Sequence, residues 1–139
     1  MPETVRPASP SNIDPPTRIL LVEDEDATRA VMADLLGDAG FDVTATCTGD
    51  EAAILIADEG RFDLLLTDIS MPGAIDGLGL AEHAREMVPG LPVLFVSGRP
   101  EYASRVDVVG PPTAFLSKPF DMERVMQAIA SLLARSSVH

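Results

Sequence analysis

The chain is 139 residues long and has a formal net charge of −12, which suits one domain with its own core. So negative a chain is a poor ligand for nucleic acid, because phosphate backbones are bound through Lys and Arg. Its single cysteine, Cys47, excludes an internal disulfide, and no stretch approaches the roughly 20 apolar residues that span a membrane. We therefore expect a cytoplasmic protein with no membrane insertion and no direct nucleic-acid binding.

The N-terminal segment is rich in proline and in small polar residues. This composition disfavours both helices and central strands. We interpret residues 1–17 as a flexible leader, residues 18–135 as one folded domain and residues 136–139 as a tail.

From Arg18 onward, short apolar runs alternate with longer segments of helical period, a pattern typical of a parallel α/β sheet. Five such units fit the chain. The apolar runs are mostly continuous, as expected of strands that helices cover on both faces. The predicted strands are Ile19–Val22, Val43–Cys47, Leu64–Thr67, Val93–Ser97 and Ala114–Ser117.

Apolar stripes at helical spacing follow four of the five strands. Thr48 and Glu51 have the spacing of a capping box before the second stripe, and Asp121 is a candidate N-cap of the last helix. The segment Glu101–Val109 is short and ends in Gly-Pro-Pro, which predicts a brief or irregular fourth helix.

Polar residues stand at the ends of four of the predicted strands or directly after them. Glu23 and Asp24 follow the first strand, Asp68 follows the third, Ser97 ends the fourth and Lys118 follows the fifth. In an open parallel sheet, functional residues gather beyond the carboxyl ends of the strands. We therefore expect these five side chains to share one edge of the sheet.

Most of the polar residues at the strand ends also have a purely structural interpretation. Asp26 and Glu25 can serve as caps of the first helix, but Glu23 and Asp24 lie too early in the chain for that role. Asp68 can begin a turn. Ser97 alone is an ordinary loop hydroxyl, and Lys118 alone is an ordinary surface charge. The functional hypothesis therefore rests on the group as a whole.

The group predicts a metal-assisted reaction at phosphorus. Three converging carboxylates repel one another unless a cation neutralises them, and an all-oxygen site of this charge favours Mg²⁺. Asp24 and Asp68 would hold the ion, with Glu23 acting through water and a backbone carbonyl nearby. An oxygen of Asp68 would then attack phosphorus, while Lys118 neutralises charge and the Ser97 hydroxyl bonds a phosphoryl oxygen.

Four motifs occur in order at these strand ends. They are Ile-Leu-Leu-Val-Glu-Asp at 19–24, Asp-x-x-Met-Pro-Gly at 68–73 followed by Asp-Gly at 76–77, Ser-Gly at 97–98 and Phe-x-x-Lys-Pro-Phe at 115–120. Together they resemble the receiver domain of two-component response regulators over residues 18 to about 135. The resemblance implies an α/β, CheY-like (flavodoxin-like) fold: a doubly wound, five-stranded parallel sheet with five helices and strand order 2-1-3-4-5.

The resemblance also implies a role for each acidic position. Asp68 is similar to the phosphoacceptor, which takes a phosphoryl group from a histidine kinase or a histidine phosphotransfer protein in a two-component system or phosphorelay. Glu23 and Asp24 match the acidic pair that holds Mg²⁺, and Ser70 matches the position whose backbone carbonyl is a further metal ligand. A protein of this kind is a switch rather than an enzyme, since it catalyses only its own phosphorylation and dephosphorylation.

Three further positions match the switching machinery of the family. Ser97 matches the switch hydroxyl, Lys118 the phosphate-pairing lysine and Phe115 the aromatic rotamer switch. The family also implies a cis bond between Lys118 and Pro119. Phosphorylation would change the affinity for a downstream protein that the sequence does not identify.

The sequence departs from the family pattern in three places. The turn after Pro72 is one residue longer than the commoner form, and Phe115 stands where tyrosine is frequent, so that its ring has no hydroxyl to bond. The weak fourth helix belongs to the usual signalling face.

Two other functions fit parts of the pattern. An aspartate-nucleophile phosphatase also has an aspartate at the end of a parallel strand, but the sequence Asp68-Ile-Ser-Met lacks its second aspartate. A receiver-like scaffold would bind partners without being phosphorylated. The sequence is compatible both with a stand-alone regulator and with one piece of a longer protein, such as a hybrid kinase.

Overall fold

The structure is a computed structural model that describes residues 16–59 and 61–136. Most of the predicted leader, residues 1–17, and most of the predicted tail, residues 136–139, lie outside the described residues. None of the helices in the described ranges is both long and apolar enough to cross a bilayer.

Five parallel strands form one sheet in the order β3-β2-β4-β5-β6. Counted along the chain, this is the order 2-1-3-4-5, so the predicted fold is confirmed. Every strand agrees with its prediction to within one residue at each end. In β2, β4 and β5 an uninterrupted apolar run marks a strand that is covered on both faces, whereas the two edge strands, β3 and β6, are only partly buried. The strands are β2 (Arg18–Val22), β3 (Asp42–Thr46), β4 (Leu64–Asp68), β5 (Val93–Ser97) and β6 (Thr113–Ser117).

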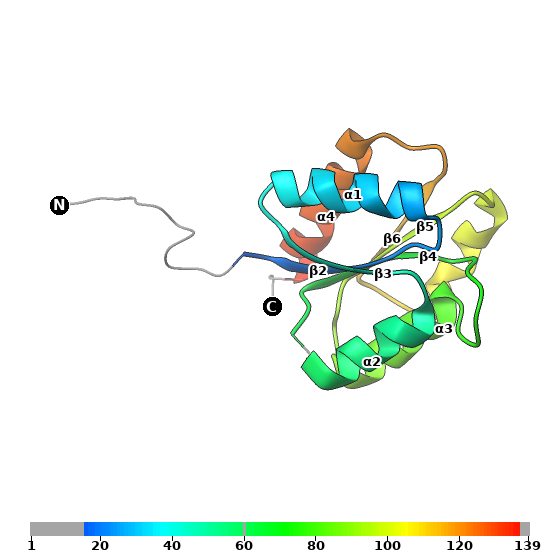
Figure 1. The fold of residues 1–139 in the computed structure, drawn as a ribbon. Coiled ribbons are helices and arrows are strands. Elements are labelled where there is room, and N and C mark those ends of the chain that lie inside the picture. The colour runs from blue at the N-terminus through cyan, green and yellow to red at the C-terminus, as the bar shows by residue number, and fades with distance from the viewer. Residues whose placement is uncertain (1–15, 60, 137–139) are drawn as a thin grey trace.

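Helices cover both faces of the sheet (Figure 1). Helices α1 (Asp26–Asp38) and α4 (Met122–Ser136) pack on one face, and α2 (Gly49–Glu59) and α3 (Gly77–Met87) pack on the other. Successive side chains of a strand point to opposite faces. Accordingly, Ile19 and Leu21 lie in the core under α1 and α4, whereas Leu20 and Val22 lie in the core under α2 and α3.

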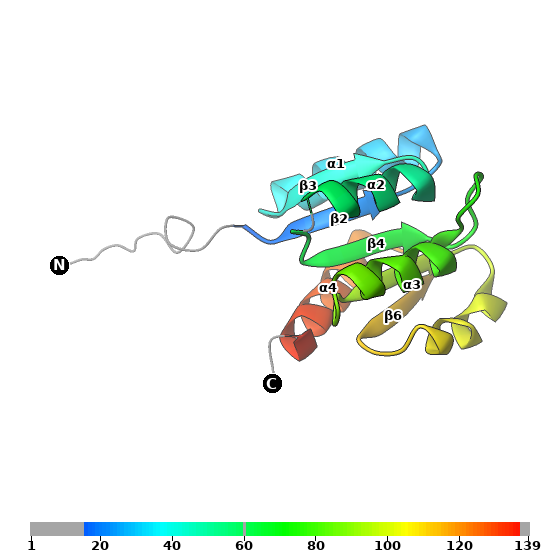
Figure 2. The same cartoon turned by 90° about the horizontal axis from the view of Figure 1, so that it is seen from below.

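The connection between β5 and β6 contains two short 3₁₀ segments, η2 (Pro100–Ser104) and η3 (Val106–Val108). They occupy the place of the fourth helix, which confirms the prediction of a brief or irregular one. Figure 2 shows this connection beside α3, beyond β6. Tyr102 of η2 packs against the core and has the guanidinium carbons of Arg99 and Arg105 5.9 and 5.2 Å from its ring centre.

The predicted caps of α2 and α4 are present. The Thr48 hydroxyl accepts a hydrogen bond from the Glu51 N–H at 3.1 Å, and Asp121 accepts one from the Arg124 N–H at 2.9 Å. The cap predicted for α1 is not formed in that way. Glu25 stands at the N-cap position but makes no side-chain cap bond, and Asp26 lies inside the first turn.

Arg85, in the last turn of α3, ties that helix to the chain that leads into β6. The three nitrogens of its guanidinium donate to five carbonyl oxygens at 2.6–3.3 Å, those of Leu91, Val109, Gly110, Pro111 and Pro112. Burial lowers the pKa of the Arg85 guanidinium, and none of these hydrogen bonds is made to a carboxylate that would oppose the effect. One cation therefore satisfies carbonyls of two connections that have no regular secondary structure, one before β5 and one before β6.

Replacing Arg85 with Met should lower the free energy of unfolding by about 2 kcal/mol, because partly buried carbonyls lose a charged donor. Urea denaturation would measure the change. The control is Arg124→Met on the exposed surface of α4, which should change stability by less than about 0.5 kcal/mol. Equal losses in the two variants would contradict the structural role of Arg85.

Candidate functional site

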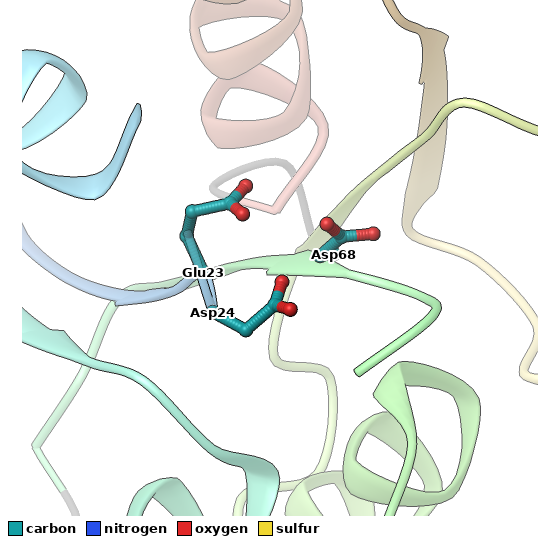
Figure 3. Close-up of side chains that lie close together, drawn as sticks. All are labelled: Glu23, Asp24 and Asp68. Atoms are coloured by element: carbon teal, nitrogen blue, oxygen red, sulfur yellow. The ribbon is translucent and has the colours of Figure 1, made fainter. Parts of the chain in front are cut away.

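The sheet places the predicted site residues at the carboxyl ends of its strands. Glu23 and Asp24 follow β2, Asp68 is the last residue of β4, Ser97 is the last residue of β5 and Lys118 follows β6. Carboxylate oxygens of Glu23, Asp24 and Asp68 lie within 4.8 Å of one another, and their side chains point toward a common space (Figure 3).

The three carboxylates differ in their exposure to solvent. Glu23 is 1% exposed and Asp68 is 5% exposed, whereas Asp24 is an exposed residue. Asp68 is buried because β4 is the central strand and every residue in it is buried. The site therefore combines two buried acids with one exposed acid.

Lys118 is the cation that faces the two buried acids. Its Nζ donates to Asp68 Oδ2 at 2.7 Å and to Glu23 Oε1 at 3.3 Å. The side chain of Lys118 is 31% exposed, so the ion pair with Asp68 is shielded from solvent on one side only. One lysine cannot balance three carboxylates, and the site keeps a net negative charge that favours a further cation.

The electrostatic environment acts on both partners of this ion pair. Burial raises the pKa of the Glu23 carboxyl, and the opposing effects of the Glu25 N–H and the Lys118 ammonium do not cancel that increase. Burial lowers the pKa of the Lys118 ammonium, but the hydrogen bond and charge of Asp68, with the charge of Glu23, outweigh it and hold the pKa above its ordinary value. Lys118 is therefore held in its charged form.

The backbone that carries Lys118 is anchored to β5. The Lys118 N–H donates to the Ser97 carbonyl at 2.8 Å, and the bond between Lys118 and Pro119 is cis, as the family resemblance implies. The ammonium reaches the site from the β6 end of the sheet.

Ser97 lies close to this site, but its hydroxyl is engaged elsewhere. The residue is 1% exposed, and its Oγ accepts a hydrogen bond from the Arg99 N–H at 3.0 Å. Within the described part of the chain, no hydrogen bond joins Ser97 to Asp68. The other predicted switch residue, Phe115, is half-buried on β6 and packs against the same core cluster as Tyr102.

The loop after Asp68 contains Ser70, the predicted carbonyl ligand, whose side chain is exposed. The longer turn that follows is held by Asp50 at the start of α2, which accepts from the Ile75 N–H at 3.3 Å. Gly73 in this turn has φ +111°, a backbone conformation that residues other than glycine rarely adopt. The extra residue of the loop is thus accommodated without displacing Asp68 from the strand end.

The sequence analysis assigned no role to two residues at the site. Gly77 is part of a quoted motif, but its steric role was not predicted: a Cβ there would lie 2.1 Å from the Asp68 carbonyl oxygen, so only glycine lets α3 begin against the end of β4. Arg29 of α1 donates to the Glu23 carbonyl oxygen at 2.9 Å and to Asp26 Oδ1 at 2.6 Å. The Asp-Gly pair at 76–77 and the three-residue spacing of Asp26 and Arg29 were the available signals.

Replacing Gly77 with Ala should destabilise the domain by about 1–3 kcal/mol, because the methyl group overlaps backbone that cannot yield without moving Asp68. The matched control is Gly79→Ala, two residues along the same helix, where the nearest heavy atom is 3.4 Å from the added Cβ. That control should be neutral, or more stable by about 0.5–1 kcal/mol, because alanine favours helix. Thermal and urea unfolding of the two variants measure the contrast, and equal effects would contradict it.

Comparison with known proteins identifies the class to which this fold and site belong. Residues 19–130 match the family described as Response regulator receiver domain. The chain is similar to the response regulator receiver protein CpdR of Brucella abortus, with 38% identity over 117 residues that cover 84% of this chain and 96% of CpdR. Other relatives are longer, and the chain spans 47% of the length of two mycobacterial transcriptional regulatory proteins.

Solved structures give the same result. The crystal structure of a response regulator receiver protein from Sinorhizobium medicae has a TM-score of 0.80 and 32% identity, covering 88% of this chain and 98% of that one. The response regulator TrrA of Thermotoga maritima, crystallised with Mg²⁺ and BeF, has a TM-score of 0.73 and 26% identity, covering 84% and 98%. The chain belongs to the receiver-domain family of response regulators, and it is a phosphoacceptor receiver domain of two-component signal transduction.

Proposed function

We propose that Asp68 is the residue that accepts the phosphoryl group, and that Glu23, Asp24 and Lys118 prepare it for that reaction. The observation that carries the proposal is the pair of bonds from Lys118 Nζ to Asp68 Oδ2 and Glu23 Oε1, beside three carboxylates within 4.8 Å of one another. Among the described residues, no hydrogen bond engages Asp68 Oδ1. That oxygen is therefore free to act as the nucleophile.

The donor is a phosphohistidine on a histidine kinase or a phosphotransfer protein, the partners with which receiver domains of this family interact. A carboxylate oxygen of Asp68 attacks phosphorus, the phosphorus–nitrogen bond breaks, and the imidazole leaves with the electron pair and takes up a proton. The transfer depends mostly on positioning and on neutralising the oxygens of the phosphoryl group. Lys118, 2.7 Å from Asp68, is placed to do so.

The acidic cluster fits Mg²⁺. Carboxylate oxygens are the ligands that this hard ion prefers, and the surplus negative charge of the site requires a cation. Asp24, Asp68 and the Ser70 carbonyl would hold the ion, with Glu23 in contact directly or through water. Bound Mg²⁺ supplies further neutralisation of the phosphoryl oxygens. The Mg²⁺ and BeF complex of TrrA supports this assignment.

We propose that the Ser97 hydroxyl and the Phe115 ring pass the change on to the protein surface. The phosphoryl group adds a charge of about −1.5 to −2 and strong acceptor oxygens at Asp68. Drawing the Ser97 hydroxyl toward them breaks its bond with the Arg99 N–H, at the start of the segment that contains η2 and η3. Phosphorylation thereby shifts a pre-existing equilibrium between two forms with different affinity for a downstream protein.

On this proposal, the chain catalyses only its own phosphorylation and dephosphorylation, and it has no separate substrate. We also place it in the cytoplasm, where the unpaired Cys47 remains reduced and kinases draw on ATP.

Replacing Asp68 with Asn should abolish labelling by radioactive acetyl phosphate, because the amide is not a nucleophile. The wild-type label should be stable in acid and labile in alkali, as an acyl phosphate is. The control is Asp34→Asn on the exposed side of α1, which should be labelled like the wild type. Wild-type labelling of the Asp68 variant would overturn the assignment. A wild-type protein that takes no label would instead be a docking scaffold, and rapid turnover of an unrelated phosphate ester would indicate a phosphatase.

Chelation of divalent cations should stop the labelling, since three carboxylates balanced by a single lysine leave a net negative charge that repels the incoming phosphoryl oxygens. Adding Mg²⁺ in excess of the chelator should restore it. The initial rate of label incorporation is the measurement, and a rate that is indifferent to chelation would remove the ion from the reaction.

A further inference from the structure

Arg29 holds the main chain that carries the two acids of β2. It lies one turn into α1, and its guanidinium reaches back to the Glu23 carbonyl oxygen at 2.9 Å and to Asp26 Oδ1 at 2.6 Å. Its side chain is 23% exposed, whereas that of Asp26 is 90% exposed. The bond to the carbonyl is thus the shielded one, and the pair with Asp26 orients the other arm of the guanidinium.

The carbonyl of Glu23 belongs to the peptide group that joins Glu23 to Asp24. That group is planar, so fixing its oxygen also fixes the nitrogen and Cα of Asp24. The other side of Glu23 is held as well, since its N–H donates to the Thr46 carbonyl at 3.1 Å and its carboxylate accepts from the Glu25 N–H at 3.1 Å. Asp24 itself is exposed, and the peptide bond before it is the part that Arg29 restrains.

We propose that Arg29 is a positioning residue for the divalent-cation site, which it serves by fixing the Glu23–Asp24 peptide so that both carboxylates face Asp68. This inference rests on the proposed Mg²⁺ site. It assigns to Arg29 no contact with the ion or with the phosphoryl group. Outer residues that orient metal ligands typically affect affinity by about 10- to 100-fold.

The direction in which the Mg²⁺ affinity changes when Arg29 is removed tests the inference. A guanidinium near the site repels a divalent cation, so its removal strengthens Mg²⁺ binding if charge is all that matters. If Arg29 acts by positioning, its removal weakens binding, because Asp24 and Glu23 gain alternative orientations. The two explanations predict changes in opposite directions.

The experiment is a calorimetric titration of the full chain with Mg²⁺, for the wild type and for Arg29→Met, at a temperature where unfolding curves show both folded. We expect the dissociation constant of Arg29→Met to rise about 10-fold or more. The matched control is Arg85→Met, which also removes a guanidinium from backbone carbonyls but lies at the C-terminal end of α3. That variant should lose stability and keep the wild-type affinity for Mg²⁺.

Arg29→Lys provides a second measurement and decides the matter if Arg29→Met does not fold. It keeps the charge but lacks the planar, two-armed geometry that joins Glu23 to Asp26, so we expect an affinity between those of the wild type and Arg29→Met. The inference would be overturned if both variants bound Mg²⁺ as tightly as the wild type or more tightly. If only Arg29→Lys folds, unchanged or tighter Mg²⁺ binding by that variant would overturn it. A wild-type protein that binds no Mg²⁺ would refute the proposed metal site instead, which separates the two failures.

Discussion

The ion pair between Lys118 and the two buried acids is the interaction on which the rest of the site depends. Carboxylates as enclosed as those of Glu23 and Asp68 are costly to bury unless a charged partner and hydrogen bonds compensate for lost water. Lys118 provides that compensation at 2.7 and 3.3 Å. It leaves one oxygen of Asp68 without a hydrogen bond among the described residues, and this is the oxygen that we propose as the nucleophile.

The parallel sheet brings these side chains together. Every strand ends at the same edge, and the central position of β4 brings Asp68 between the acids that follow β2 and the lysine that follows β6. Two apolar cores, one on each face, hold the strand ends in place. The backbone refines the positions: Gly77 lets α3 begin against Asp68, and Arg29 restrains the peptide after Glu23.

Sequence reasoning located the three inner strands because continuous apolar runs mark buried parallel strands. It located Glu23, Asp68 and Lys118 because each stands directly after a predicted strand. It could not find the bonds that Arg29 and Arg85 donate to main-chain carbonyls, because every residue has a carbonyl group and such a bond requires no particular residue type in the partner. It also could not foresee that the Ser97 hydroxyl is bonded to the Arg99 N–H, since that depends on the local turn. The residue types at the strand ends indicated the chemistry of the site, whereas the hydrogen bonds that hold its backbone became visible only in the structure.

Tyr102 has a practical consequence for spectroscopy. It is the only tyrosine in a chain without tryptophan, so the intrinsic near-ultraviolet emission of the whole protein comes essentially from one phenol ring. That ring lies in the 3₁₀ region, near two guanidinium groups and against the same core cluster as Phe115. The protein therefore contains a built-in optical reporter of the segment that begins at Ser97, and no label has to be introduced to observe it.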